Sequence, residues 1–228
     1  MIRQLGIRLA LSFGSNPMAA HTRSRRRLPI DSKKVAALGV VLTTSALLVG
    51  YFVWMVQPAA AREATAACNG LKGNPQNPAL GAIPRPAPDF TVQSIDGKPV
   101  KLSDFRGKVV LLHNWASWCG ACEQEKPSLI RMADEMVNRD FEIVSLASDV
   151  SWDAVKKSLP PGGVPFRVYL DKPDDEGTIG PISTSWGTHA VPESFLIDRK
   201  GRIRYYFDNR RDWDSPVTET CIQSLIDE

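Results

Sequence analysis

One stretch of the chain has no charged residue over 22 positions, from Val35 to Val56. As a helix rising about 1.5 Å per residue, it matches the roughly 30 Å hydrocarbon core of a bilayer. Residues 1–34 before it contain eight Lys and Arg against Asp31 alone. Because positively charged flanks stay inside, we predict a basic cytoplasmic tail (1–34), one transmembrane anchor (35–56) and an exported remainder. A cleaved signal peptide is the alternative, although its apolar core usually has only about 7–15 residues.

The part of the chain after the predicted tail is mildly acidic. Its 194 residues from position 35 onward contain 20 basic and 24 acidic side chains, so the net charge of +3 belongs to the tail. This charge distribution argues against a nucleic-acid partner. Residues 57–84 are rich in Ala, Pro, Gly and Asn and predict a linker. Residues 85–228 are long enough for one folded domain.

Strand and helix patterns alternate through this domain. We expect strands at 90–93, 99–102, 108–114, 141–147, 167–170, 194–198 and 202–207, and helices at 119–138, 152–159 and 218–227. Ile95-Asp-Gly-Lys98 and Arg199-Lys-Gly201 mark hairpin turns. Leu129, Met132, Met136 and Val137 should share the buried face of the first helix. The alternation predicts an α/β sheet with helices on its faces.

The chemistry is concentrated in Trp115-Ala-Ser-Trp-Cys-Gly-Ala-Cys122, where a buried strand gives way to a helix. A helix N-terminus presents unpaired N–H groups and positive potential, which lower the pKa of a thiol below about 8.5. Cys119 can therefore attack a disulfide as a thiolate, and Cys122, one turn later, can release the mixed disulfide. The sequence thus predicts a dithiol exchange site.

Other uses of the cysteine pair are less well supported. Structural zinc needs four ligands, and no second pair stands at the required spacing. A copper carrier using Cys119, Cys122 and His189 remains an alternative, as does a merely structural disulfide. If Cys119 and Cys122 form a dithiol exchange site, we expect no metal and no cofactor.

Five stretches of the domain form a recognisable set of motifs: Ala87-Pro-Asp-Phe90, Leu102-Ser-Asp-Phe-Arg-Gly-Lys108, Trp115 to Cys122, Glu125-Lys-Pro127 and Val191-Pro-Glu-Ser-Phe-Leu-Ile-Asp198. Together they resemble the motifs of the membrane-anchored thiol-disulfide oxidoreductases of the TlpA/ResA/DsbE (CcmG) group. The resemblance implies a thioredoxin fold with an N-terminal β-hairpin and a central insertion, preceded here by one transmembrane helix.

The resemblance also assigns further site residues. It implies a cis Pro192 packed beside Cys119, with Trp118 and Val191 on the substrate surface, and an active-site carboxylate at Glu125. His113 departs from the group, which usually has Asn or Asp there. His113 is either a catalytic residue or a hydrogen-bonded core histidine. Burial of Glu125 would raise its pKa toward neutrality.

Two cysteines lie outside the motif, Cys68 in the predicted linker and Cys221 in the closing helix. An even count in an oxidising compartment favours a second, structural disulfide between them. Two free thiols, or a lipid anchor on Cys68, are the alternatives.

The resemblance implies an exported disulfide reductase held in the inner membrane. Its expected partners are protein disulfides, apocytochrome c among them, and a transmembrane thiol electron donor. The resemblance favours cytochrome c maturation but does not establish it, because Ala190 replaces a glycine common in the DsbE signature. A peroxiredoxin-like peroxidase is the alternative enzyme. It shares the Pro-Ala-Pro-Asp-Phe opening, but that class places a threonine before its reactive cysteine.

Overall fold

The computed structural model describes residues 31–71, 81–174 and 177–228. Its contacts divide the chain into two units, Met1–Tyr51 and Phe52–Glu228. The predicted tail lies outside the described residues up to position 30. Within helix α1 (Ser32–Leu71), the stretch Ser32–Val56 is long and apolar enough to cross a membrane by length and composition, and none of it is buried.

Helix α1 does not end where the predicted linker begins. It continues from the apolar stretch to Leu71, so the first half of the predicted linker, 57–84, is helical. Its last turns are fixed by tertiary contacts, because Cys68 is fully buried and Ala67 and Leu71 pack against the core. Residues 72–80 of the predicted linker lie outside the described residues.

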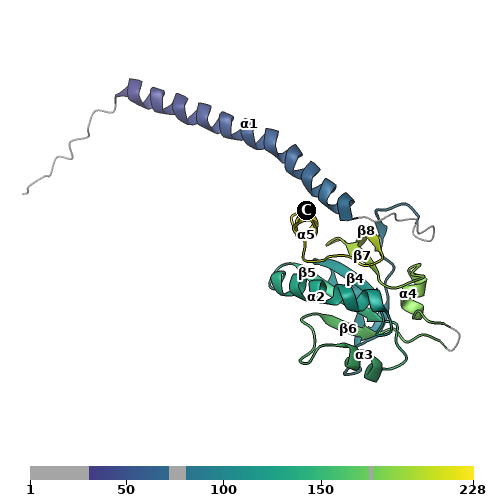
Figure 1. Ribbon diagram of the computed structural model, residues 1–228. Helices are drawn as coiled ribbons and strands as arrows, with labels where there is room; N and C mark the ends of the chain where they lie inside the picture. Colours follow the sequence, from purple (N-terminus) through teal and green to yellow (C-terminus); the bar gives the residue numbers. More distant parts are fainter. Residues whose placement is uncertain (1–30, 72–80, 175–176) are drawn as a thin grey trace, which may run out of the picture. The chain divides into compact units, whose positions relative to one another are not determined.

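A mixed six-stranded sheet forms the centre of the second unit (Figure 1). Its order is β1-β8-β7-β4-β5-β6, with bounds Arg85–Pro86, Arg202–Asp208, Glu193–Ile197, Val109–Trp115, Phe141–Ala147 and Arg167–Leu170. Strand β4 lies in the middle, parallel to β5 and antiparallel to β7, and all seven of its residues are buried. This burial on both faces explains why its sequence is nearly continuously apolar.

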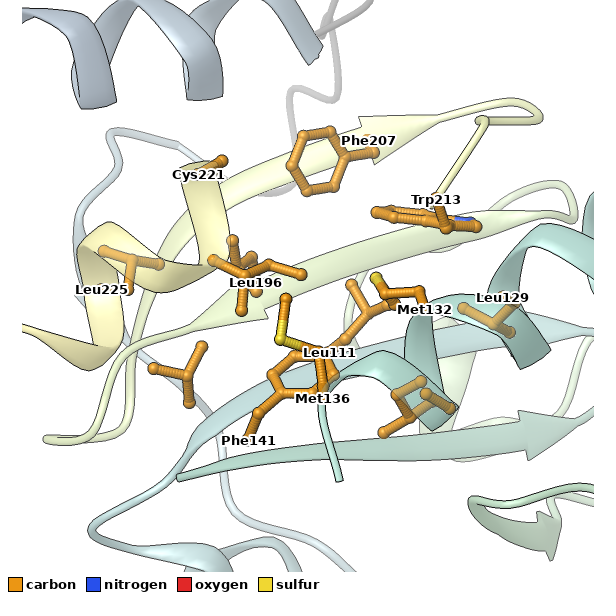
Figure 2. Packing of buried hydrophobic residues seen from close by; sticks show 14 of the residues in the cluster. Leu111, Leu129, Met132, Met136, Phe141, Leu196, Phe207, Trp213, Cys221 and Leu225 are labelled. Carbon is orange, nitrogen blue, oxygen red and sulfur yellow. The ribbon is translucent and has the colours of Figure 1, made fainter. Parts of the chain in front are cut away.

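One face of the sheet packs against helices α2 (Gly120–Glu135) and α5 (Pro216–Ile226), as Figure 2 shows. The shared core includes Leu111, Leu129, Met132, Met136, Phe141, Leu196, Phe207, Trp213, Ile222 and Leu225. The expectation for Val137 is wrong, since its side chain is 56% exposed. Helix α2 ends at Glu135, and Asn138 takes a left-handed φ of 67°, so the helical face does not extend to Val137.

The opposite face is covered mainly by irregular and extended chain. The predicted N-terminal hairpin is present as β2 (Thr91–Gln93) and β3 (Pro99–Lys101), and a 3-10 turn (Leu102–Phe105) follows it. Helix α4 (Pro181–Ser185) also contributes here, although the sequence pattern did not indicate it. Helix α3 (Trp152–Ser158) and β6 form the segment between β5 and α4.

Candidate active site

The predicted dithiol stands at the junction of β4 and α2. Cys119 is the N-cap residue of α2 and is joined to Cys122 by a disulfide. The backbone N–H of Cys122 points at Cys119 Sγ from 3.1 Å. Cys119 is 7% exposed and Cys122 is 2% exposed, so both are buried and Cys119 is the more accessible. In the reduced protein this helix terminus favours a thiolate at Cys119.

The loop before β7 forms the other wall of the site. The Val191–Pro192 peptide bond is cis, and the Val191 carbonyl oxygen lies 3.3 Å from Cys119 Sγ. Trp118 is 58% exposed, and its Nε1 donates to the carbonyl of Ser148 at 3.1 Å. Since Val191 is only half-buried, an exposed apolar surface borders the more accessible sulfur.

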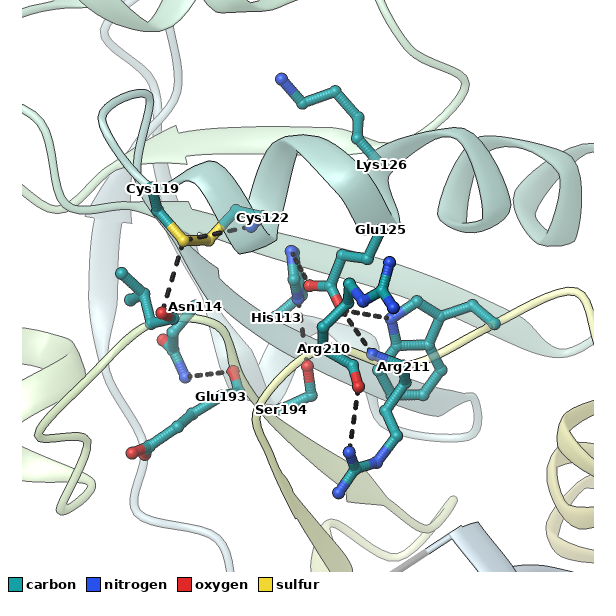
Figure 3. A network of polar contacts seen from close by, with 12 residues as sticks. His113, Asn114, Cys119, Cys122, Glu125, Lys126, Glu193, Ser194, Arg210 and Arg211 are labelled. Atoms are coloured by element: carbon teal, nitrogen blue, oxygen red, sulfur yellow. Dashed lines mark hydrogen bonds and ion pairs between the residues drawn. A yellow bond between two sulfur atoms is a disulfide. The ribbon is translucent and has the colours of Figure 1, made fainter. Parts of the chain in front are cut away.

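His113 and Glu125 meet beneath the disulfide, on β4 and α2 respectively (Figure 3). His113 Nε2 lies 3.4 Å from Glu125 Oε1, without the alignment of a hydrogen bond, and His113 Nδ1 lies 3.0 Å from Ser194 Oγ. The side chains of both residues are at most 4% exposed. His113 on β4 and Glu125 on α2 therefore face each other in the core between the sheet and the helix.

Burial shifts the pKa of each group so that its uncharged form is favoured. Burial raises the pKa of Glu125 to about 7, against hydrogen bonds from the Arg211 backbone N–H and from Trp213 Nε1. Burial lowers the pKa of His113 to about 3, helped by the positive charge of Lys126. Near neutral pH the imidazole is neutral, whereas Glu125 titrates.

A neutral His113 imidazole between Ser194 and Glu125 can interact favourably with either the ionised or the protonated carboxyl of Glu125. When Glu125 is ionised, the tautomer with a proton on Nε2 faces it; when Glu125 is protonated, Nε2 can face its O–H as an acceptor. The Ser194 hydroxyl fits both tautomers, because it donates or accepts. His113 also lines a cavity of about 10 Å³ together with Cys122. The arrangement can therefore store a proton close to the second cysteine.

The cysteines outside the motif lie on α1 and α5. Cys68 and Cys221 form a disulfide across a sequence separation of 153, and both are fully buried. Cys68 lies in the part of the predicted linker that continues α1.

Sequence reasoning missed the residues that hold Glu125. The Arg211 backbone N–H donates to Glu125 Oε2 at 2.9 Å, and Trp213 Nε1 donates to the same oxygen at 3.3 Å. These donors stand 86 and 88 residues after Glu125. No local pattern signals such a pairing, because it depends on the path from β8 to α5.

The copper-carrier reading needs a third ligand beside the two sulfurs. Within the described ranges, no group of three His, Cys, Asp or Glu side chains is arranged to hold a metal ion. His189, the candidate ligand, is exposed in the loop before Val191.

Comparisons with known proteins agree with this geometry. The model of the AhpC/TSA family matches residues 83–206. The thiol-disulfide oxidoreductase ResA of Bacillus thuringiensis subsp. konkukian is 35% identical over 121 residues, which cover 53% of this chain and 66% of ResA. ResA of Bacillus subtilis is 31% identical over 117 residues, covering 51% and 62%. The match thus spans just under two thirds of these relatives.

Among solved structures, a putative thiol:disulfide interchange protein DsbE from Chlorobium tepidum is 32% identical, with a TM-score of 0.54. The match covers 63% of this chain and 96% of that one. The chain therefore belongs to the AhpC/TSA family within the thioredoxin superfamily, and it is similar to the thiol-disulfide oxidoreductases of ResA and DsbE type.

Proposed function

We propose that this protein is a membrane-anchored, extracytoplasmic disulfide reductase. The observation that carries the proposal is the position of Cys119, at the N-terminus of α2 and 3.3 Å from the Val191 carbonyl oxygen. A sulfur in this position is activated by the helix terminus and borders an exposed apolar surface. The named activity of the ResA relatives supports the same reaction class.

The reaction runs in two exchanges. The Cys119 thiolate attacks one sulfur of a substrate disulfide, which forms a mixed disulfide and releases the first substrate thiolate. The Cys122 thiolate then attacks Cys119 Sγ, releases the second substrate thiolate, and leaves the Cys119–Cys122 disulfide seen in the structure. Two electrons pass from the enzyme to the substrate, and the substrate thiolates take up two protons.

Glu125 and His113 serve the second exchange. Cys122 lies one turn into α2 and gains less than Cys119 from the helix terminus. Its thiol must lose a proton before it attacks. Glu125, with a pKa of about 7, accepts that proton near neutral pH, and the neutral His113 lies beside its carboxyl. Glu125 is thus the base of the release step, and His113 is a positioning residue for it.

The remaining parts of the proposal concern partners and place. The stretch Ser32–Val56 anchors the chain in the inner membrane, and the basic tail stays in the cytoplasm. Exported proteins with disulfides are the substrates, and the DsbE-like Pro192-Glu193-Ser194-Phe195 favours apocytochrome c among them. A membrane dithiol donor returns the enzyme to its reduced form, because each cycle consumes two electrons.

Insulin reduction by the full chain in detergent tests the proposal. We expect Cys119→Ser to abolish activity, and Cys122→Ser to accumulate a mixed disulfide through Cys119. In cells the same Cys122→Ser variant should capture the natural substrate covalently. Retained insulin reduction by Cys119→Ser would exclude Cys119 as the attacking thiol. Peroxide consumption that exceeds disulfide reduction would instead favour the peroxidase alternative.

A further inference from the structure

Arg211 contacts two distant parts of the chain at once. Its guanidinium Nε donates to the carbonyl oxygen of Leu71, the last residue of α1, at 3.0 Å. Its backbone N–H donates to Glu125 Oε2 at 2.9 Å (Figure 3). One residue therefore joins the end of the anchor helix to the active-site carboxyl.

The contact at Leu71 is made to a firmly attached end of the helix. Cys68, three residues earlier, is bonded to Cys221 of α5. Ala67 and Leu71 pack on the core that α2 and α5 share. The C-terminal turns of α1 thus give the Arg211 guanidinium a fixed acceptor.

The chain around Arg211 is held on its other side as well. Asp208 Oδ1 accepts from the guanidinium at 3.1 Å, and the Arg210 carbonyl accepts from it at 3.0 Å. Two residues further on, the Trp213 backbone N–H donates to Ser128 Oγ of α2 at 3.1 Å. The connection from β8 to α5 is therefore fastened to α1 through a side chain and to α2 through backbone groups.

We propose that Arg211 is a positioning residue through which the disulfide-linked end of α1 sets the hydrogen bonding of Glu125, and thereby the rate at which Cys122 releases product. The inference rests on the proposed function, in which Glu125 serves the second exchange. It makes the Cys68–Cys221 bond a regulator of the redox site as well as a structural crosslink. Opening that bond, or removing the Arg211 side chain, slows release without touching either reactive sulfur.

The groups that face Glu125 fix the direction of the effect. His113 faces it from β4 and is neutral near pH 7, while Arg210 and Arg211 face it from the connection before α5. The N–H groups of Arg211 and Trp213 stabilise the ionised carboxylate. When the Arg211 contact loosens, the pKa of Glu125 rises, and less carboxylate is present at neutral pH to accept the Cys122 proton.

Arg211→Ala, with Arg210→Ala as the matched control, tests the proposal. Both changes remove one positive charge that faces Glu125, but Arg210 binds Gln124 and not Leu71. Stopped-flow mixing of the reduced full chain in detergent with a fluorescent disulfide peptide separates attack from release between pH 5 and 9. We expect Arg211→Ala to move the midpoint of release upward by roughly 0.5–1 pH unit. Release at pH 7 then falls by roughly two- to fivefold, with the attack rate unchanged.

Three further variants sharpen the result. Arg211→Lys keeps a donor that can reach the Leu71 carbonyl and should restore part of the shift. Cys68→Ser/Cys221→Ser should move the midpoint in the same direction, and adding Arg211→Ala should change it little further. If this double variant does not fold, the comparison of Arg211→Ala, Arg211→Lys and Arg210→Ala still decides.

Equal midpoints in Arg211→Ala and Arg210→Ala would overturn the inference. That outcome differs from failure of the proposed function, in which the wild-type protein would show no attack phase with the disulfide peptide. A slower attack phase in Arg211→Ala would also count against the inference, because it would indicate general damage rather than a shifted carboxyl.

Discussion

The two disulfides of this protein are the same bond in two different surroundings. Cys119–Cys122 joins residues three apart at the start of α2, beside the exposed Trp118 and the titrating Glu125. Cys68–Cys221 joins residues 153 apart, with both cysteines fully buried between α1 and α5. Both cysteines of the second bond belong to the apolar core cluster that α2 and α5 share.

This contrast shows that position decides what a disulfide does. A sulfur at a helix terminus with an open approach exchanges, because its thiolate is stabilised and a partner can reach it. A bond enclosed by core side chains closes a long loop and is shielded from attack. The predictions below weaken or sharpen this division of roles.

The largest expected difference is in stability. On the chain-entropy model, losing the Cys68–Cys221 crosslink costs up to about 5 kcal/mol of unfolding free energy, against about 2 kcal/mol for Cys119–Cys122. Urea unfolding of Cys68→Ser/Cys221→Ser and Cys119→Ser/Cys122→Ser, compared with the oxidised wild type, measures both. Equal losses from the two variants would show that loop length does not separate the bonds.

Reducibility should differ by at least about a hundredfold in rate. We expect mild dithiol to open Cys119–Cys122 while Cys68–Cys221 persists, because an attacking thiol cannot reach a fully buried sulfur. Partial reduction, alkylation and peptide mapping give the order. If Cys68 and Cys221 take the first label, the buried bond is not protected.

The smallest expected effect concerns only the exchanging bond. The pKa of Glu125 is about 7, so its carboxylate is scarce below that pH and prevails above it. Release should therefore rise through pH 7 in the wild type, and Glu125→Gln should flatten this profile and slow release about tenfold at pH 8. His113→Asn should shift the profile and leave the fold intact.

Stopped-flow traces with a fluorescent disulfide peptide measure this release step, and the attack phase of the same traces is the internal control. Unchanged release rates between pH 5 and 9 in both Glu125→Gln and His113→Asn would reduce the pair to a structural role. In either outcome the Cys68–Cys221 bond should reduce at its wild-type rate.

The sequence was sufficient wherever the controlling interaction is local. The apolar run of β4 and the N-terminal position of Cys119 follow from neighbouring residues. The spacing of three after Cys122 predicted only that Glu125 shares a helix face with it, and the family resemblance implied its place at the active site. The ends of helices differed from the predicted ones where a capping residue sets them. The closing helix was predicted at 218–227, but α5 begins at Pro216, because the Ser215 hydroxyl accepts from the Thr218 N–H.

Tertiary contacts explain what the sequence did not reveal. Composition indicated a linker after position 56 but not that α1 continues into it. Ala is the strongest helix former, and contacts of Cys68 and Leu71 with the core favour the helix. Arg211 and Trp213 reach Glu125 only through the course of the β8–α5 connection. Such pairings leave no periodic trace in a single sequence.

The placement of the four cysteines has a consequence for how an exported chain matures. Four thiols allow three pairings, and Cys68 precedes every strand of the domain whereas Cys221 follows them all. Cys119 and Cys122, three residues apart, meet at small loop-closure cost and can pair as soon as they emerge. The crosslink between Cys68 and Cys221, by contrast, can close only after the whole sheet and α5 have been synthesised, so the two bonds belong to opposite ends of the assembly of this domain.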